Sequence, residues 1–360
     1  MRLIALLALS ACTPVAHTFD EVEEWPIIEA KNAVEPTADP AEVRILTWNI
    51  KFGGARVDFF FDGWGDRVHM SEKEVNRNVD GIIAVIEELD PDILMAQEVD
   101  VNSKRSAWVD QADEILKRTD FNYYAWVPAW WVEYIPEEGL GHVEMGQAVF
   151  SKYPIVRNTR IDLPQSEDSS FVVNYFWLHR AVQITEVELG AAGTLTVVNN
   201  HPTAYSLDGT KSIHMDEIFK RSNAAKGMMV TGGDLNVIPP GSARTEDFAD
   251  EADTNTTGVT TVTYSKADMA SLEPFYEAWT PVLPLADYGT KEEEQEAFYS
   301  HSVSGKIFWT QKLDYLFTNQ AWSGGWHLQK PGDGPDGGIA SDPMALSDHA
   351  PIVADLVVIP

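Results

Sequence analysis

Polar side chains that can bind metals or move protons stand where the apolar runs of this sequence end. Eight oxygen-bearing or imidazole residues occupy such positions: Asn49, Glu98, His201, Asp234, Asn236, Asp314, Asp348 and His349. One polar residue at a strand end is commonly a cap or a turn former. The full set indicates a shared site, because sheet proteins gather their ligand groups at strand ends.

The chemistry of these side chains points to a hard divalent cation. Carboxylate and amide oxygens suit Mg²⁺, Mn²⁺ or Ca²⁺. Structural zinc is not expected, because the only cysteine is Cys12 and the sequence has no closely spaced histidine pair. A dication beside two imidazoles and an acid is the set that phosphoester hydrolysis requires. The metal neutralises phosphate charge, and a histidine oriented by a carboxylate removes a proton from water.

Asp348 and His349, in "ALSDHAPIVADL" (345–356), show how one segment could serve both tasks. Neighbouring side chains on an extended chain point to opposite faces, so one could hold the metal while the other handles a proton. A polar surface turn is the alternative interpretation of this motif taken alone.

The runs between these residues predict an α/β fold, because two early strand–helix pairs are followed by many strands. Helices are predicted over 71–92, where Ser71 and Glu74 form a capping box, and over 106–118. Strands are predicted over 43–50, 92–98, 145–151, 155–162, 179–188, 194–200, 228–234, 312–318 and 350–358. The intervening stretches 236–300 and 319–346 read as long loops that shape a binding face.

Two aromatic stretches, "FFFDGWGD" (59–66) and "YYAWVPAWWVEYIP" (123–136), leave two interpretations open. Their rings could stack on bases, bind a sugar or a choline-like headgroup, or enter lipid. They could equally pack in the core and at its rim.

The composition predicts one large folded domain over residues 43–360, which we expect to be a monomer. The chain has 360 residues, of which 44% are hydrophobic, so it can bury a sizeable core. Lys plus Arg total 26 and Asp plus Glu total 56, giving a net charge of −30. A field of this sign argues against an extended nucleic-acid track or adsorption to anionic lipid, although a local positive pocket on a bound cation is compatible with it.

The first twelve residues, "MRLIALLALSAC", have the layout of a secretory leader. Their apolar run is too short to cross a bilayer, and "LSAC" (9–12) resembles a bacterial lipobox, whose cysteine is lipidated after cleavage. An ordinary signal peptide is the alternative. Residues 13–42 are rich in Pro, Glu and Ala and predict a flexible tether. We therefore expect a cell-envelope lipoprotein, in the outer membrane or periplasm, that meets the membrane only through Cys12.

Taken in order, the motifs resemble the endonuclease/exonuclease/phosphatase superfamily, the DNase I-like fold. The resemblance is carried by "GDLN" (233–236), "SDHAP" (347–351) and "MGQAVFSKYPI" (145–155), and it spans about residues 43–358. It implies a four-layer sandwich, with two packed β-sheets flanked by helices and the site at one edge.

The resemblance also implies a metal and phosphate site. Glu98 is similar to the principal metal ligand, with Asn49 and Asp348 shaping the site around it. Arg180 stands where many members carry a phosphate-facing or structural arginine, and an ion pair at the rim is its alternative role. Lys211 could reach a substrate phosphate or simply be a solvated helix residue.

Proton transfer is implied at the histidines. His349 matches the general base and Asp314 its orienting carboxylate, while His201 matches the second histidine, which faces the scissile phosphate. Asp234 and Asn236 match the pair that orients the nucleophile and binds a phosphate oxygen.

The sequence departs from the family pattern around the second histidine. The common Thr-His-Leu is here Asn200-His201-Pro202, and the proline removes a backbone donor. The acid that pairs with this histidine in some nucleases has no clear match, with Glu133 and Glu144 as weak candidates.

The function expected from these features is hydrolysis of small or lipid-headgroup phosphoesters, by a phosphodiesterase or a phosphatase. A secreted endonuclease or exonuclease is the alternative, and a non-catalytic surface binding protein on the same fold is a third possibility. A serine hydrolase acting through Ser347 is not supported, because the sequence has no Gly-x-Ser-x-Gly elbow; Ser347 is expected to cap a turn.

Overall fold

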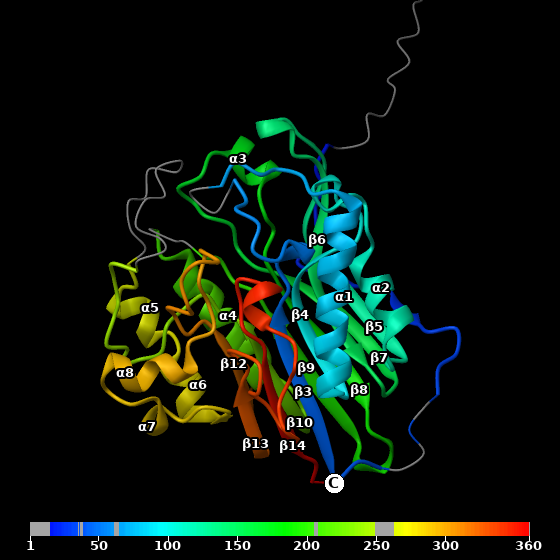
Figure 1. The fold of residues 1–360 in the computed structure, drawn as a ribbon, viewed down its shortest axis with the longest axis vertical. Coiled ribbons are helices and arrows are strands. Elements are labelled where there is room, and N and C mark those ends of the chain that lie inside the picture. Colours follow the sequence, from blue (N-terminus) through cyan, green and yellow to red (C-terminus); the bar gives the residue numbers. More distant parts are fainter. Residues whose placement is uncertain are drawn as a thin grey trace, which may run out of the picture.

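Two seven-stranded mixed sheets lie face to face at the centre of the molecule (Figure 1). The structure is a computed structural model that describes residues 15–34, 36, 39–60, 65–204, 208–248 and 263–359. Between the sheets lies a continuous apolar layer to which both contribute, for example Ile45 and Met95 from one sheet and Val197 and Val230 from the other. The expected four-layer α/β sandwich is confirmed.

The first sheet contains the strand that begins the predicted domain. Its spatial order is β13 (Ala321–His327), β14 (Ile352–Val357), β3 (Glu42–Asn49), β4 (Ile93–Asp100), β6 (Gly141–Ser151), β5 (Tyr123–Ile135) and β2 (Ile27–Glu29). Only the neighbours β3 and β4 run parallel within it. Their ends, Asn49 and Gln97, are therefore side by side.

The second sheet has a similar pattern. Its order is β1 (Val22–Glu24), β7 (Ile155–Asp162), β8 (Ala181–Glu188), β9 (Thr194–Asn200), β10 (Met228–Asp234), β12 (Asp314–Thr318) and β11 (Thr280–Pro281). β9 and β10 are parallel, and the end of β10 pairs with the start of β12 through Asp234 and Asp314. A hydrogen bond of 2.7 Å from Gln97 Nε2 to Asn199 Oδ1 joins the two sheets beside these ends. One edge of the sandwich thus collects the polar strand ends of both sheets.

Helices cover both outer faces (Figure 1). They are α1 (Glu72–Leu89), α2 (Gln111–Arg118), α3 (Phe171–Phe176), α4 (Thr210–Asn223), α5 (Lys266–Ala270), α6 (Glu273–Ala278), α7 (Leu285–Tyr288) and α8 (Glu292–Gln295). α1 and α2 pack on the first sheet, while α4 and α6 pack on the second. The predicted capping box is present: Ser71 Oγ accepts from the Glu74 amide, and Glu74 accepts from the Ser71 amide.

The predicted tether over residues 13–42 is wrong for its central part. β1 pairs with β7 and β2 pairs with β5, so this short segment joins the edges of both sheets. Phe19 covers the buried Arg160, with 3.8 Å from the guanidinium carbon to the ring centroid. The segment is ordered because its few apolar residues complete surfaces supplied by strands far away in the sequence. Residues 1–14, with the predicted leader and Cys12, lie outside the described residues.

Other elements differ from expectation in extent. The aromatic stretch 123–136 is the long strand β5, where rings such as Trp130 are buried, so core and rim packing is the better interpretation of it. The predicted helix over 106–118 starts only at Gln111. Among its described residues, the stretch 236–300 contains the four short α-helices α5 to α8, and 319–346 contains β13. Within the described part of the chain, no helix is long and apolar enough to cross a bilayer.

Candidate active site

A buried histidine–carboxylate pair forms the centre of the candidate site. His349 Nδ1 lies 2.9 Å from Asp314 Oδ2, and both side chains are almost fully buried. The backbone of His349 is fixed as well, because Trp48 Nε1 donates to its carbonyl at 2.8 Å. Burial lowers the pKa of His349, but the carboxylates of Asp314 and Asp234 raise it by more, to about 10. The imidazole is therefore oriented, and the neighbouring carboxylates stabilise its protonated form.

Asp234 lies between the two predicted histidines. Its Oδ2 is 3.3 Å from His201 Nε2 and 3.5 Å from His349 Nε2, and it also accepts from Asn49 Nδ2 at 3.1 Å. Burial raises the pKa of Asp234, against the opposing effect of the His349 charge. Four of the predicted residues, from four separate segments, therefore meet at one carboxylate oxygen.

Glu98 borders the same space from the end of β4. Its Oε1 is 3.8 Å from His201 Nε2 and 3.4 Å from Asn49 Nδ2. Burial raises the pKa of Glu98, and the charge of Asp348 adds to the effect. The residue has a positive φ of 54°, which a non-glycine residue holds only when its surroundings impose it. A half-buried carboxylate with an acidic neighbour is the kind of oxygen donor that a hard dication prefers.

A second grouping could also hold a metal. The ligand atoms of Asp234, Asp314 and His349 all lie within 4.8 Å of one another. Metal binding at Asp314 and His349 would replace the 2.9 Å hydrogen bond between them. His349 could then no longer accept a proton. We therefore favour the Glu98 side, where the hydrogen bond that the acid accepts from Asn49 Nδ2 is longer, at 3.4 Å.

Asp348 has a partner that the sequence did not reveal. Its Oδ2 forms a 2.9 Å ion pair with the buried Lys51 Nζ, and its Oδ1 accepts from Ser347 Oγ at 3.3 Å. The charge of Lys51 lowers the pKa of Asp348 well below its usual range despite burial. Metal binding by Asp348 stays a prediction, and Lys51 joins the site as a fixed positive charge. In the sequence, the only indication that Lys51 belongs to the site is its position just after an apolar strand.

Ser347 acts as the expected turn cap. Its Oγ donates to the Asn49 carbonyl at 2.7 Å and accepts from the His349 amide at 3.1 Å. The hydroxyl thereby holds the strand end that carries Asn49 against the turn that carries the base.

Asn236 sits on the far side of Asp234 in a left-handed conformation, with φ of 54°. Its amide N–H donates to Asp234 Oδ1 at 3.0 Å, and its Nδ2 donates to the Pro202 carbonyl at 3.1 Å. The unusual proline thus still supplies an acceptor to the site. Lys211 is buried, not solvated, because its Nζ donates to the Asn236 carbonyl at 2.9 Å. It supports the turn, and the expectation of a solvated helix residue is wrong.

Arg180 lies close enough to Glu98 and Asp234 for their charges to raise its pKa, although burial lowers it by more. None of the described carboxylates is within ion-pair distance of Arg180, so the alternative of a rim ion pair is not supported. Its Nη1 is buried without a hydrogen-bond partner among the described residues. This geometry is compatible with the predicted contact to a substrate phosphate.

The acid partner of His201 is not one of the residues that the sequence suggested. Glu133 and Glu144 both pair with His142, at 3.3 Å and 2.8 Å. The carboxylates near His201 are instead Asp234 and Glu98. Burial lowers the pKa of His201 well below its usual range, so the ring is neutral.

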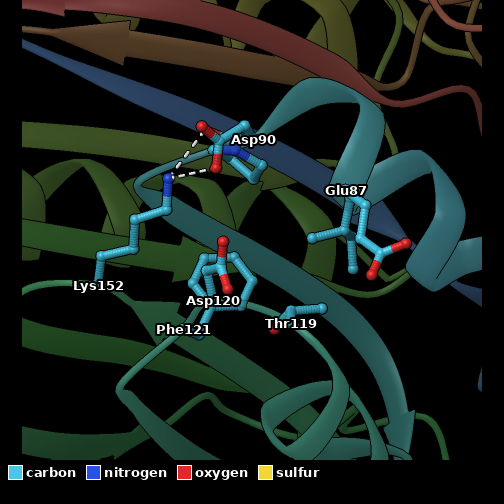
Figure 2. Close-up of a pocket in the computed structure, with 8 residues that line it drawn as sticks. Glu87, Asp90, Thr119, Asp120, Phe121 and Lys152 are labelled. Carbon is cyan, nitrogen blue, oxygen red and sulfur yellow. Dashed lines mark hydrogen bonds and ion pairs between the residues drawn. The ribbon is translucent and has the colours of Figure 1, made fainter. Parts of the chain in front are cut away.

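A cavity of about 380 Å³ lies away from this chemistry, at the opposite end of β4 (Figure 2). Asp90, Asp120, Phe121 and Lys152 line it, and Lys152 Nζ pairs with Asp90 Oδ1 at 2.6 Å. It contains none of the predicted site residues.

Comparison with known proteins agrees with the geometry. The model of the "Endonuclease/Exonuclease/phosphatase family" matches residues 46–349. This chain belongs to that family. Its members are typically hydrolases that act on phosphoester bonds, and they generally use divalent metals. No curated protein matched the sequence.

Solved structures support the fold. A family protein from Beutenbergia cavernae DSM 12333 is 17% identical, with a TM-score of 0.54 over 89% of this chain and 72% of that one. A family protein from Bacteroides vulgatus is 17% identical, with a TM-score of 0.51 over 89% of this chain and 100% of that one. A family protein from Leptotrichia buccalis C-1013-b is 15% identical, with a TM-score of 0.51 over 87% of this chain and 99% of that one. At these identities the likeness concerns architecture alone.

Proposed function

We propose that this protein is a divalent-metal-dependent phosphoester hydrolase. One observation carries the proposal: His349, oriented by Asp314 at 2.9 Å, and His201 both direct Nε2 at the same oxygen of Asp234. Such an arrangement places a proton acceptor and a neutral donor around one small volume at the sheet edge. A binding protein has no need for an oriented base of this kind.

Each residue has a defined task in the proposed reaction. His349 accepts a proton from the attacking water, and Asp314 holds the ring and stabilises the imidazolium. Asp234 orients the water, while Asn236 and Arg180 contact phosphate oxygens. A Mg²⁺, Mn²⁺ or Ca²⁺ ion held by Glu98 and Asn49 would neutralise phosphate charge and assist the leaving oxygen.

Small or lipid-headgroup phosphoesters are the substrates we propose. The net charge of −30 opposes long polyanions, whereas a compact phosphoester needs only the local positive charges of Arg180 and Lys51. Hydrolysis of DNA or RNA is the competing activity within the same family.

A substrate panel tests this proposal. The purified chain is given a phosphomonoester, a soluble phosphodiester, phosphatidylcholine vesicles and plasmid DNA, each in Mg²⁺ and in chelator. We expect metal-dependent release from at least one of the first three at a rate well above that on DNA. Preferential cleavage of plasmid DNA would establish a nuclease, and no turnover on any substrate would refute catalysis.

We also propose that the chain is a cell-envelope lipoprotein acylated at Cys12. Support comes from the leader layout and the "LSAC" motif. Intact mass of the mature protein is the test. A lipidated Cys12 at the new N-terminus is expected, and a free or uncleaved Cys12 contradicts the proposal.

A further inference from the structure

An exposed apolar surface lies on and around α3. We call it the apolar rim; it consists of Val15, Tyr134, Phe171, Val172, Val173 and Trp177. Phe171 is 83% exposed and Val172 is 63% exposed, which is unusual for neighbouring large apolar side chains. Contiguous apolar patches on a soluble surface commonly mark an interaction site.

The apolar rim lies at the same end of the sandwich as the candidate active site. α3 belongs to the connection between β7 and β8, at the sheet end where β9 delivers Asn200 and His201. The same connection ends at Arg180, whose carbonyl accepts from the Leu163 amide at 2.9 Å. Figure 1 shows α3 beyond the strand ends, at the opposite extreme of the molecule from the C-terminus. Whatever the apolar rim contacts therefore lies on the active-site side.

The N-terminal part of the described chain leaves the body at this surface. The Ala16 amide donates to the hydroxyl of Tyr175, on α3, at 3.2 Å, and Ala16 also pairs with Val132. Cys12 precedes Ala16 by four residues, and four residues reach at most about 14 Å. The attachment point of a lipid on Cys12 would therefore lie within that distance of Ala16, which contacts α3 through Tyr175.

We propose that the apolar rim inserts into the surface of a lipid bilayer, so that the active site faces phosphoesters displayed at that surface. This inference rests on the proposed hydrolase function and names its substrate class. Insertion depends on apolar area and not on charge, because the exposed acids Glu167 and Asp168 lie a few residues before α3. The same acids disfavour a second copy as the occupant, since a two-fold contact would bring these like charges together.

Site-directed spin labelling tests the insertion directly. Cys12 is the only cysteine, so the full chain with Cys12→Ser accepts a single label at Val172→Cys or, as the control, at Ile359→Cys near the C-terminus. With phosphatidylcholine vesicles, we expect the label at 172 to become accessible to oxygen and shielded from a water-soluble nickel chelate. The label at 359, also on an exposed apolar position, should stay in water. A label at 172 that stays in water, or one that shows spin–spin broadening without vesicles and so reports self-association, overturns the proposal.

Hydrolysis gives the second readout. In the full chain, the double variant Phe171→Ser with Val172→Ser should hydrolyse vesicle-borne phosphoesters roughly tenfold more slowly, because less apolar area is buried. Its rate on a soluble phosphodiester and its circular dichroism should match those of Ile359→Ser. Equal loss on both substrates, or no loss on vesicles, contradicts membrane docking. Absence of turnover in every variant would instead count against the proposed function, while the label would still report docking.

Discussion

At the scale of the single residue, Asp314 acts through His349, the proposed general base. The 2.9 Å bond between them is buried, so no solvent competes for the imidazole, and the carboxylate fixes which nitrogen faces the site. When residues act as one unit, the effects of substituting them on the reaction rate are strongly non-additive.

This coupling gives the first prediction. His349→Ala and Asp314→Asn should each lower the rate of phosphodiester hydrolysis by at least ~100-fold, the scale of a general base contribution. The double variant should be no slower than His349→Ala alone, because the second change removes a partner that no longer has a task. The measurement is steady-state kinetics in saturating Mg²⁺. Additive losses in the double variant would show that the two side chains act independently.

Which residue types form the site could be predicted from sequence, but their partners could not. Glu98, Asp234 and His349 were found because each lies at an end of an apolar strand, which is a local signal. The Lys51–Asp348 pair spans almost the whole chain, and Lys211 looked solvated because its acceptor, the Asn236 carbonyl, lies in another segment. Long-range partners depend on the sheet order, which local patterns do not contain.

Arg105 supports the site at the scale of elements. Its guanidinium makes two hydrogen bonds to Asp100, of 2.9 and 3.0 Å, at the end of β4. The same group lies 3.7 Å from the ring centroid of Phe52, in the turn just after Asn49. One cation thus ties together the two parallel strand ends that present Asn49 and Glu98.

Removing the Arg105 guanidinium should destabilise the fold. Arg105→Met leaves Asp100 buried and unpaired, which we expect to lower the free energy of unfolding by about 3–5 kcal/mol. Arg118→Met is the matched control, because its pair with Asp80 is exposed and should matter by less than about 1 kcal/mol. Urea unfolding of both variants makes the comparison. Equally small losses of stability in the two variants would show that Arg105 does not join these two strand ends.

Elements differed in how well the sequence predicted them, for physical reasons. α1 carries its own signals, namely an apolar stripe at helical spacing and a capping box, so it was predicted correctly. β5 was not recognised as a strand, because its aromatic run lacks the alternation of a strand with one solvated face. β1 and β2 have three residues each and depend on pairing with distant strands.

The N-terminal segment acts on the whole molecule, because it binds an edge of each sheet. A chain that starts at residue 30 would lose β1, β2 and the Phe19 ring over Arg160. We expect its free energy of unfolding to fall by about 2 kcal/mol or more relative to a chain that starts at residue 15, since buried apolar area is lost at both sheets. The measurement is denaturant unfolding of the two chains. Equal midpoints would restore the interpretation of this segment as a tether.

The central claim for the whole molecule is that segments distant in sequence converge on a bound cation that supports phosphoester cleavage. The direct test is the initial rate on a soluble phosphodiester, in chelator and with Mg²⁺ added back, for the wild type, Glu98→Gln and Glu133→Gln. Glu133 is the matched control, since it pairs with His142 outside the site. We predict no wild-type activity in chelator, full recovery with Mg²⁺, Mn²⁺ or Ca²⁺, a loss of at least ~100-fold for Glu98→Gln and normal rates for Glu133→Gln. Undiminished turnover in chelator, or a Glu98→Gln variant as active as the wild type, would contradict the account.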